Sequence, residues 1–185
     1  MENRERNILE AATRVFLRYG VKRTSMADIA AEADVARQTL YNIYTNKDDI
    51  LRGSIRMYGE DALVAIQEGL PKLVSTSDKV DLVLREMTIK PYEILHSSPN
   101  AQDLIEGYNS AGRDEMEANY LAFQEQLSQI FVPYSKELTK QNLTPQLLAE
   151  LVRRSASAIK YQAKDKAHLL RLMRGLKGLV ASIVR

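Results

Sequence analysis

Apolar residues recur every three or four positions along most of this chain, the spacing typical of α-helices with one buried face. Residues 8–19 carry the first such stripe, and Gly20 follows it as a helix stop signal. Glycine and proline are few, with 8 and 5 in 185 residues, and strand-like alternation is not evident. The pattern therefore predicts an all-α chain of about nine helices.

Caps and breaks in the periodicity divide the rest of the chain. Nothing between Ile159 and Leu169 is a strong helix breaker, although Asp165 is a candidate cap there. The predicted helices cover residues 47 to about 69, capped by Asn46, about 78 to 95, kinked at Pro91, a short stretch after Pro99, a long stretch through 116–131 that ends near Pro133, and two more, the first opened by Thr144.

Residues 24–51, TSMADIAAEADVARQTLYNIYTNKDDIL, predict two short helices joined by a tight turn and followed by a third helix start. Ser25 and Asp28 have the spacing of a capping box, and Val35 is the apolar plug of the turn. The second helix runs from Arg37 to about Tyr44. The predicted inward residues of both helices are Met26, Ile29, Ala30, Ala33, Leu40, Ile43 and Tyr44.

The outward side chains of this segment are suited to duplex DNA. Arginine binds guanine with two hydrogen bonds, glutamine and asparagine do so with adenine, and threonine offers a hydroxyl or a methyl. The predicted base contacts are Arg37, Gln38, Thr39 and Asn42, and the predicted phosphate contacts are Thr24, Ser25, Tyr41, Tyr44 and Lys47. A solvated face of a small helical domain that does not bind DNA would carry the same residue types, so that alternative stays open.

Charge is unevenly distributed, although its sum is only +2. Lysine and arginine against aspartate and glutamate count 9 to 8 in residues 1–52, 8 to 15 in 53–152 and 9 to 1 in 153–185. The basic tail keeps helical spacing, which favours a packed helix with a cationic face over a nucleic-acid arm. With no cysteine, no apolar run of membrane length and a charged start, we expect a cytoplasmic protein without a membrane partner.

Residues 8–51 resemble the DNA-binding domain of the TetR family of bacterial transcriptional regulators. The shared features are the first helix ILEAATRVFLRYG, the Thr-Ser helix start, the Ile-Ala pair, the Thr-Leu-Tyr of the recognition helix and the lysine before the fourth helix. The chain departs from the family in having Asp34 where glycine is usual and Ala36 where serine is common. Aspartate tolerates the left-handed backbone, so we expect the turn to survive.

The resemblance implies a helix-turn-helix domain over residues 1–46 and a helical effector-binding and dimerisation domain over 47–185, linked by the helix 47–69. It also implies a homodimer that reads a palindromic operator, with two C-terminal helices from each subunit at the interface. The wide apolar surface of the last two helices agrees with a partner. The expected interface residues are Leu151, Ser155, Ile159, Leu169, Leu172, Met173, Leu176, Leu179, Val180 and Ile183, and Gly175 and Gly178 would permit close backbone approach.

The resemblance further implies a cavity for a small-molecule effector that releases the DNA, with repression the usual outcome. We expect neither a cofactor nor a metal. The acidic middle segment is compatible with a cationic effector, although solvated carboxylates explain the same count. The aromatic and methionine residues expected around the cavity, each of which could equally be ordinary core, are Tyr58, Met87, Tyr92, His96, Tyr108, Met116, Tyr120 and Phe123.

The sequence also bears on two other classes of function. An enzyme is disfavoured because two histidines, no cysteine and no glycine-rich phosphate loop leave no recognisable catalytic set. A helical protein-interaction module of the same fold that has lost DNA binding is compatible with the departures at Asp34 and Ala36. The sequence thus favours a DNA-binding regulator and leaves the interaction module as the alternative.

Overall fold

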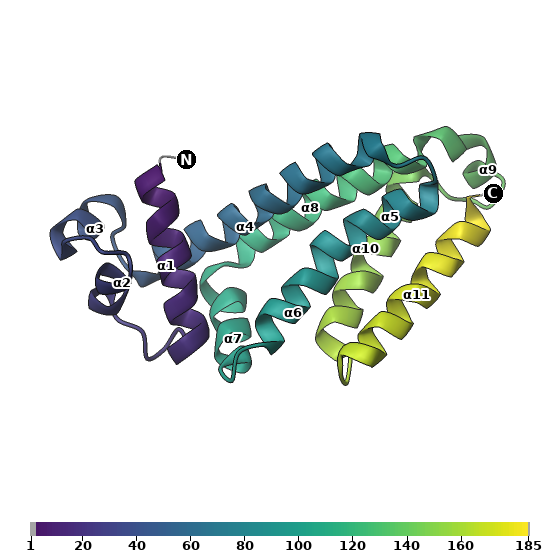
Figure 1. Cartoon of the computed structure of the whole chain (residues 1–185). Coiled ribbons are helices and arrows are strands. Elements are labelled where there is room, and N and C mark those ends of the chain that lie inside the picture. Colours follow the sequence, from purple (N-terminus) through teal and green to yellow (C-terminus); the bar gives the residue numbers. More distant parts are fainter. Residues whose placement is uncertain (1–2, 185) are drawn as a thin grey trace. The chain divides into compact units, whose positions relative to one another are not determined.

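The computed structural model describes residues 3–184, without the side chains of residues 101, 102, 108 and 109. The described residues form helices and no strand, as predicted (Figure 1). In chain order the elements are α1 (Asn3–Tyr19), α2 (Met26–Glu32), α3 (Arg37–Ile43), α4 (Lys47–Gly69), the 3-10 turn η1 (Leu70–Lys72), α5 (Thr76–Leu84), the π-helical segment η2 (Arg85–Ile89), α6 (Lys90–His96), α7 (Ala101–Ala111), α8 (Arg113–Phe131), the 3-10 turn η3 (Val132–Tyr134), α9 (Ser135–Thr139), α10 (Pro145–Gln162) and α11 (Lys166–Ile183).

Helix ends lie where the capping signals predict them. The amide of Asp49 donates to Asn46 Oδ1 at the start of α4, Thr144 caps α10, and the amide of His168 donates to Asp165 Oδ1 at 2.7 Å at the start of α11. Taken as one helix, α5, η2 and α6 bring the number of α-helices in the described residues to nine when the five-residue α9 is left out. The turns η1 and η3 and the helix α9 had no signal strong enough to predict them.

The predicted kink near Pro91 takes the form of a π-helical segment. Proline has no amide hydrogen and its ring crowds the preceding turn, so the regular hydrogen-bond ladder cannot continue through it. The extra residue per turn in η2, directly before Pro91, accommodates this break. The predicted single helix over 78–95 is therefore α5, η2 and α6 in series.

The chain divides into two compact units. Unit 1 takes in the residues up to Asp61 together with Ile94–Asn119, and unit 2 takes in Ala62–Glu93 and the residues from Tyr120 on. The division differs from the predicted boundary after residue 46. The reason is packing, because the first half of α4 and helix α7 bury Ile50, Leu51 and Leu104 in the same core as α1–α3.

The core of unit 1 forms around the apolar stripe of α1. Ile8 and Phe16 are at most 1% exposed and pack with Ile29 of α2, Leu40 of α3 and Leu51 of α4. Burying side chains of this size stabilises a fold by about 1.5–3 kcal/mol each. At the surface, Glu32 of α2 accepts a hydrogen bond from Arg14 Nε of α1 at 2.8 Å. This ion pair helps to orient α2 against α1.

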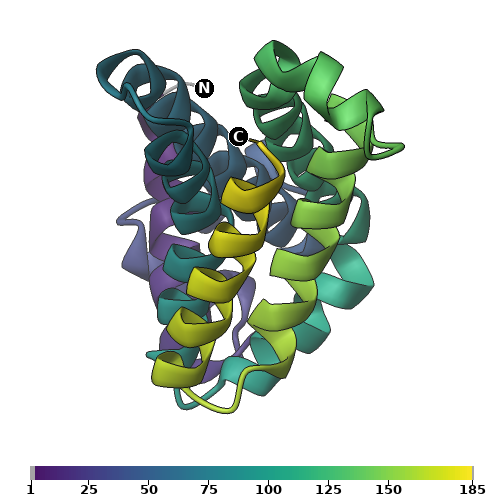
Figure 2. The same cartoon turned by 90° about the vertical axis from the view of Figure 1, so that its right-hand side faces the viewer.

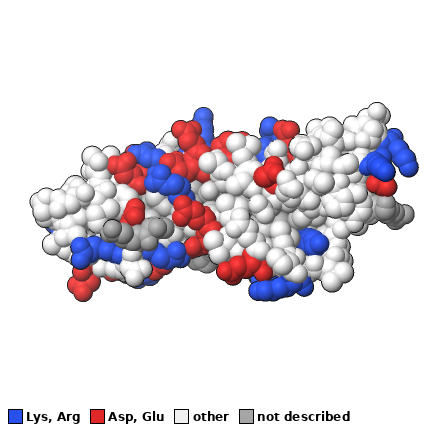
Figure 3. Space-filling view, turned by 90° about the horizontal axis from the view of Figure 1, so that it is seen from above, with Lys and Arg blue, Asp and Glu red and all other residues white. Residues whose placement is uncertain are grey.

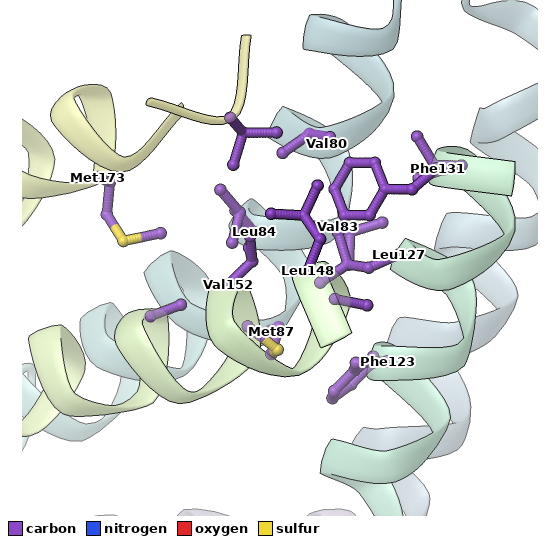
Figure 4. Packing of buried hydrophobic residues seen from close by; sticks show 14 of the residues in the cluster. Val80, Val83, Leu84, Met87, Phe123, Leu127, Phe131, Leu148, Val152 and Met173 are labelled. Carbon is purple, nitrogen blue, oxygen red and sulfur yellow. The ribbon is translucent and has the colours of Figure 1, made fainter. Parts of the chain in front are cut away.

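The core of unit 2 is built mainly from α5, η2, α8, α10 and α11, with Ile66 of α4, Tyr92 of α6 and Leu138 of α9. Figure 4 shows Val83 and Leu84 of α5 beside Leu127 and Phe131 of α8 and Val152 of α10. These residues are at most 2% exposed. Most, but not all, of the apolar residues that give the C-terminal half its periodicity are therefore packed in one continuous core.

The basic tail is paired with the acidic middle of the chain. Lys166 and Lys177 of α11 lie 2.7 Å from the carboxylates of Glu93 and Asp81, all within unit 2. Blue and red surfaces accordingly lie interspersed on the face shown in Figure 3. Such exposed pairs contribute little energy each, but they agree with a packed cationic helix and not with an arm. Among the described residues we found no helix with the length and apolarity of a membrane span.

Asp34 offers a test of the turn. Its φ of 53° lies in the left-handed region, which a β-branched residue adopts poorly. We expect Asp34→Val to lower the free energy of unfolding by about 1–2 kcal/mol and Asp34→Gly to change it by less than about 1 kcal/mol, both measured by urea denaturation followed by circular dichroism.

The control is Ala36→Val, since Ala36 is exposed and has an extended backbone with φ −63° and ψ 143°. This change should cost no more than about 0.5 kcal/mol. Equal losses in Asp34→Val and Ala36→Val would contradict the left-handed assignment.

Candidate functional site

The helix-turn-helix is held by its own local contacts. Ser25 and Asp28 form the predicted capping box, in which the Asp28 amide donates to Ser25 Oγ and the Ser25 amide donates to Asp28 Oδ2. Hydrogen bonds from the Ser25 hydroxyl and amide, and to a smaller degree the charge of Arg37, hold the pKa of the Asp28 carboxyl below its usual range. The amide group of Asn7 donates to the Ala33 carbonyl at 3.0 Å and ties the turn to α1.

Helix α3 presents a polar face to solvent. Arg37, Gln38 and Asn42 are exposed, and Thr39 is half-buried. Gln38 Nε2 donates to Asn42 Oδ1 at 3.0 Å, so the two amide side chains lie together one turn apart. The donors and acceptors of this face are those that read base edges in a major groove.

Two predicted phosphate contacts are corrected by the structure. Thr24 is 3% exposed, and its hydroxyl donates to the Gly20 carbonyl at 2.7 Å. Tyr44 is 7% exposed, and its hydroxyl donates to Glu5 Oε1; burial and the Glu5 charge raise its pKa. Both hydroxyls serve the fold of unit 1, which leaves Tyr41, 52% exposed, and Ser25 of the four predicted hydroxyl contacts at the surface.

Ile43 was expected to point inward and is instead 39% exposed. Helix α3 ends at this residue, and Tyr44 has an extended backbone with φ −127° and ψ 126°. The chain therefore leaves helical geometry one residue earlier than the periodicity assumes, and Tyr44 fills the inward position. Ile43 therefore adds an apolar side chain to the exposed surface of α3.

Lys47 holds the loop between α1 and α2. Its ammonium donates to the carbonyls of Val21 and Thr24, at 2.5 and 3.0 Å. Lys22 and Lys47 also line an open hollow of about 370 Å³ together with Asp103 and Glu106, and none of the residues expected around the effector contributes to it. A phosphate contact by Lys47 stays a prediction, next to this loop-holding contact.

Helices α10 and α11 lie side by side in unit 2 (Figure 2). Both helices carry exposed apolar residues. Leu151 of α10 is 48% exposed, and Leu172 and Leu179 of α11 are 37% and 64% exposed. Ser155 is exposed too, and Cβ atoms added at Gly175 and Gly178 would meet nothing within 4 Å. These residues form a surface of apolar and small side chains, which we call the α10–α11 face.

Three residues expected at the dimer interface belong to the core instead. Leu169, Met173 and Val180 are at most 5% exposed and pack in unit 2. They lie on the side of α11 that packs against the other helices of unit 2. Ile159, Leu176 and Ile183 are partly buried against the same core.

The residues expected around an effector fall into both units. Met87, Tyr92 and Phe123 are buried in the core of unit 2, and Tyr120 packs against it. Thr88 in η2 lies among them in sequence, and its buried hydroxyl has no partner among the described residues. The other four residues are Tyr58, 40% exposed, His96, exposed, and Met116, partly buried, all in unit 1, and Tyr108, whose side chain lies outside the described residues.

Sequence reasoning did not single out two buried cations of α10. Arg153 and Lys160 are each 5% exposed and lie on the core side of the helix. The signal was present, because positions 149, 152, 153, 156 and 160 share the helix face that faces the core. Basic residues at such positions were read as part of a solvated face.

Comparison with known proteins gives concordant results. Residues 8–53 match the family profile of bacterial regulatory proteins of the tetR family. The HTH-type transcriptional regulator TtgR of Pseudomonas putida is 33% identical over 104 residues, which cover 48% of this chain and 47% of that protein. The chain thus spans about half the length of the curated relatives it matches.

Solved structures with the same fold extend over the whole chain. A TetR-family transcriptional regulator from Streptomyces coelicolor has a TM-score of 0.66 at 16% identity, covering 98% of this chain and 97% of that one. FadR from Bacillus subtilis in complex with stearoyl-CoA has a TM-score of 0.64 at 19% identity, covering 97% and 95%. Helix-turn-helix and sequence similarity place residues 8–53 in the TetR family of bacterial regulatory proteins, and the whole chain shares the fold of a solved TetR-family regulator.

Proposed function

We propose that this chain is a sequence-specific DNA-binding transcriptional regulator, a repressor that a small-molecule effector releases from a palindromic operator. The observation that carries the proposal is the exposed polar face of α3, with Arg37, Gln38 and Asn42 beside the well-capped α2. In the proposed complex these residues contact bases, with Thr39 at the edge of the contact. Ser25, Tyr41 and Lys47 contact phosphates and set the register.

A homodimer would supply the second reader. One seven-residue helix covers only a few base pairs, whereas two related by a twofold axis about 34–36 Å apart read a palindrome. The α10–α11 face supports this assembly because its leucines are exposed in the single chain. Large exposed apolar patches usually mark interaction surfaces.

The effector would bind in unit 2. Its helices include the π-helical segment η2, and such segments recur at functional sites. A TetR-fold relative, FadR from Bacillus subtilis, is in complex with stearoyl-CoA, which supports an effector for this chain. The regulator and its DNA would act in the cytoplasm.

Selection of duplex DNA from a random pool at near-physiological salt tests the main proposal. Enrichment of a palindrome would establish sequence-specific binding by a dimer. A folded dimer that enriches no sequence would instead favour the interaction module that has lost DNA binding. The selected duplex also becomes the probe for the experiments that follow.

Arg37 is the first base contact to test. Arg37→Ala should weaken binding of the selected duplex by about 1–3 kcal/mol and relax its sequence preference, because a bidentate contact to guanine is lost. Fluorescence anisotropy with matched and scrambled duplexes measures both effects.

The control is Arg174→Ala, which removes an exposed arginine of unit 2. It should bind both duplexes as the unchanged protein does. If the Arg37 and Arg174 variants bind alike, helix α3 is not the reader.

Leu179 tests the proposed dimer. Leu179→Glu should convert the dimer to a monomer, because each subunit would place a carboxylate in the apolar centre of the interface. The subunit itself should stay folded, since Leu179 is 64% exposed. Sedimentation velocity gives the assembly state, and circular dichroism checks the fold.

Leu121→Glu is the matched change on α8, where Leu121 is 52% exposed. This variant should remain a dimer. A dimer that survives Leu179→Glu would place the interface elsewhere.

A further inference from the structure

Arg153, Lys160, Tyr120 and Tyr161 form a cluster in unit 2. Lys160 Nζ donates to the Tyr120 hydroxyl at 2.8 Å and lies 4.7 Å from the centre of the Tyr161 ring. The Tyr120 ring has Lys160 Nζ at 5.1 Å and the Arg153 guanidinium at 5.9 Å from its centre. Two cations therefore share one aromatic ring.

Both cations are buried without an anion. Arg153 and Lys160 are each 5% exposed, and no carboxylate in the described part of the chain lies within 4.0 Å of either. A buried charge is costly unless it is paired, and like charges near one another add to the cost. Aromatic rings offset only part of this cost.

The buried carboxylate of unit 2 is arranged differently. Glu86 is 5% exposed, but Lys90 Nζ lies 2.6 Å from its Oε2 and Arg85 Nε lies 3.8 Å from its Oε1. Its negative charge is therefore already matched by its own neighbours. The buried charge of unit 2 that has no counter-ion is positive, which argues against the cationic effector considered from the sequence.

The cluster has hydrogen-bond donors to spare. Arg153 Nε donates to Gln124 Oε1 at 2.8 Å, which uses one of the five guanidinium N–H groups. Lys160 uses one of its three on Tyr120. Among the described residues we find no acceptor for the other donors. Burial opposes ionisation of Tyr120, but the charge and hydrogen bond of Lys160 outweigh it and lower the pKa of the hydroxyl.

We propose that Arg153 and Lys160 bind the anionic group of an organic effector, a carboxylate, sulfonate or phosphate ester on an apolar or aromatic body. This inference rests on the proposed function and names the chemical class of its effector. The anion accepts hydrogen bonds from the unused donors of the two side chains. Tyr120 and Tyr161 contact the body of the ligand, next to the core around Met87 and Phe123.

Two dyes with the same ring system separate charge from apolar binding. 1-Anilinonaphthalene-8-sulfonate is an anion, and N-phenyl-1-naphthylamine is the same molecule without the sulfonate. The chain has no tryptophan, so the fluorescence of both dyes is read without interference. The 185-residue chain should bind the anionic dye at least about tenfold more tightly than the neutral dye, the scale of a charge-assisted hydrogen bond.

Lys160→Gln and Arg153→Gln should each reduce the ratio of the anionic-dye affinity to the neutral-dye affinity about tenfold. The affinity for the neutral dye should stay within about twofold of that of the unchanged protein. Lys160→Arg keeps the charge and should keep the preference. The matched control is Lys164→Gln, which removes an exposed lysine two residues beyond α10. It should leave both dyes unchanged.

Other results would overturn the inference. An unchanged preference in both Lys160→Gln and Arg153→Gln would mean that the anion binds elsewhere, and equal affinities of the unchanged protein for the two dyes would mean that the cluster selects no anion. If one variant binds neither dye, its fold or its whole site is lost, and the dye preference of the other variant is used for the test. DNA binding of the same samples is measured separately, so failure here leaves the regulator proposal intact.

Melting temperature separates a ligand-binding role from a structural one. Lys160→Met keeps the length of the side chain and removes its charge, so the unliganded protein should melt at the same or a higher temperature. The anionic dye should raise the melting temperature of the unchanged protein and not of this variant. A lower melting temperature for Lys160→Met, with the dye shift retained, would assign Lys160 to the fold alone.

Discussion

The packing of Leu40 against α1 and α2 is the contact on which the exposed polar face of α3 depends. Helix α3 has seven residues, too few to be stable alone in water. Leu40, 0% exposed, is its single buried side chain. With Leu40 fixed in the core of unit 1, the outward direction of Arg37, Gln38 and Asn42 follows from helix geometry. The direction in which this polar face points is thus set by an apolar contact on the opposite side of α3.

Local signals in the sequence predicted local structure well. The capping residues Ser25, Thr144 and Asp165 bond the amides that their spacing implies, and Asp34 has the left-handed backbone that the turn requires. Such contacts join residues within four positions of each other, so the sequence contains all their participants. The fold class follows for the same reason, because helical periodicity is read within each segment.

What the sequence could not predict is which partner covers each face. Leu169 and Leu179 belong to one apolar pattern on α11, yet the first is buried in the subunit and the second is 64% exposed. Tyr44 looked suitable for a phosphate because its acceptor, Glu5, becomes a neighbour only in the folded unit. Thr24 donates to Gly20, only four residues away, but its burial also arises only in the folded unit. The buried cations Arg153 and Lys160 were missed because basic residues were assigned to solvent. Each of these errors concerns burial, which depends on packing between segments.

The cluster of Arg153, Lys160, Tyr120 and Tyr161 includes a residue of the helix that belongs to both units. Tyr120 is on α8, and this helix begins in unit 1 at Arg113 and continues into unit 2 at Tyr120. An anion held by Arg153 and Lys160 changes the charge that Tyr120 experiences, and so acts on a helix that both units share. Coupling between two binding sites is reciprocal and typically about 1–3 kcal/mol. An anionic effector that favours an arrangement of α8 that DNA disfavours would therefore weaken DNA binding. Bound DNA would weaken effector binding by the same factor.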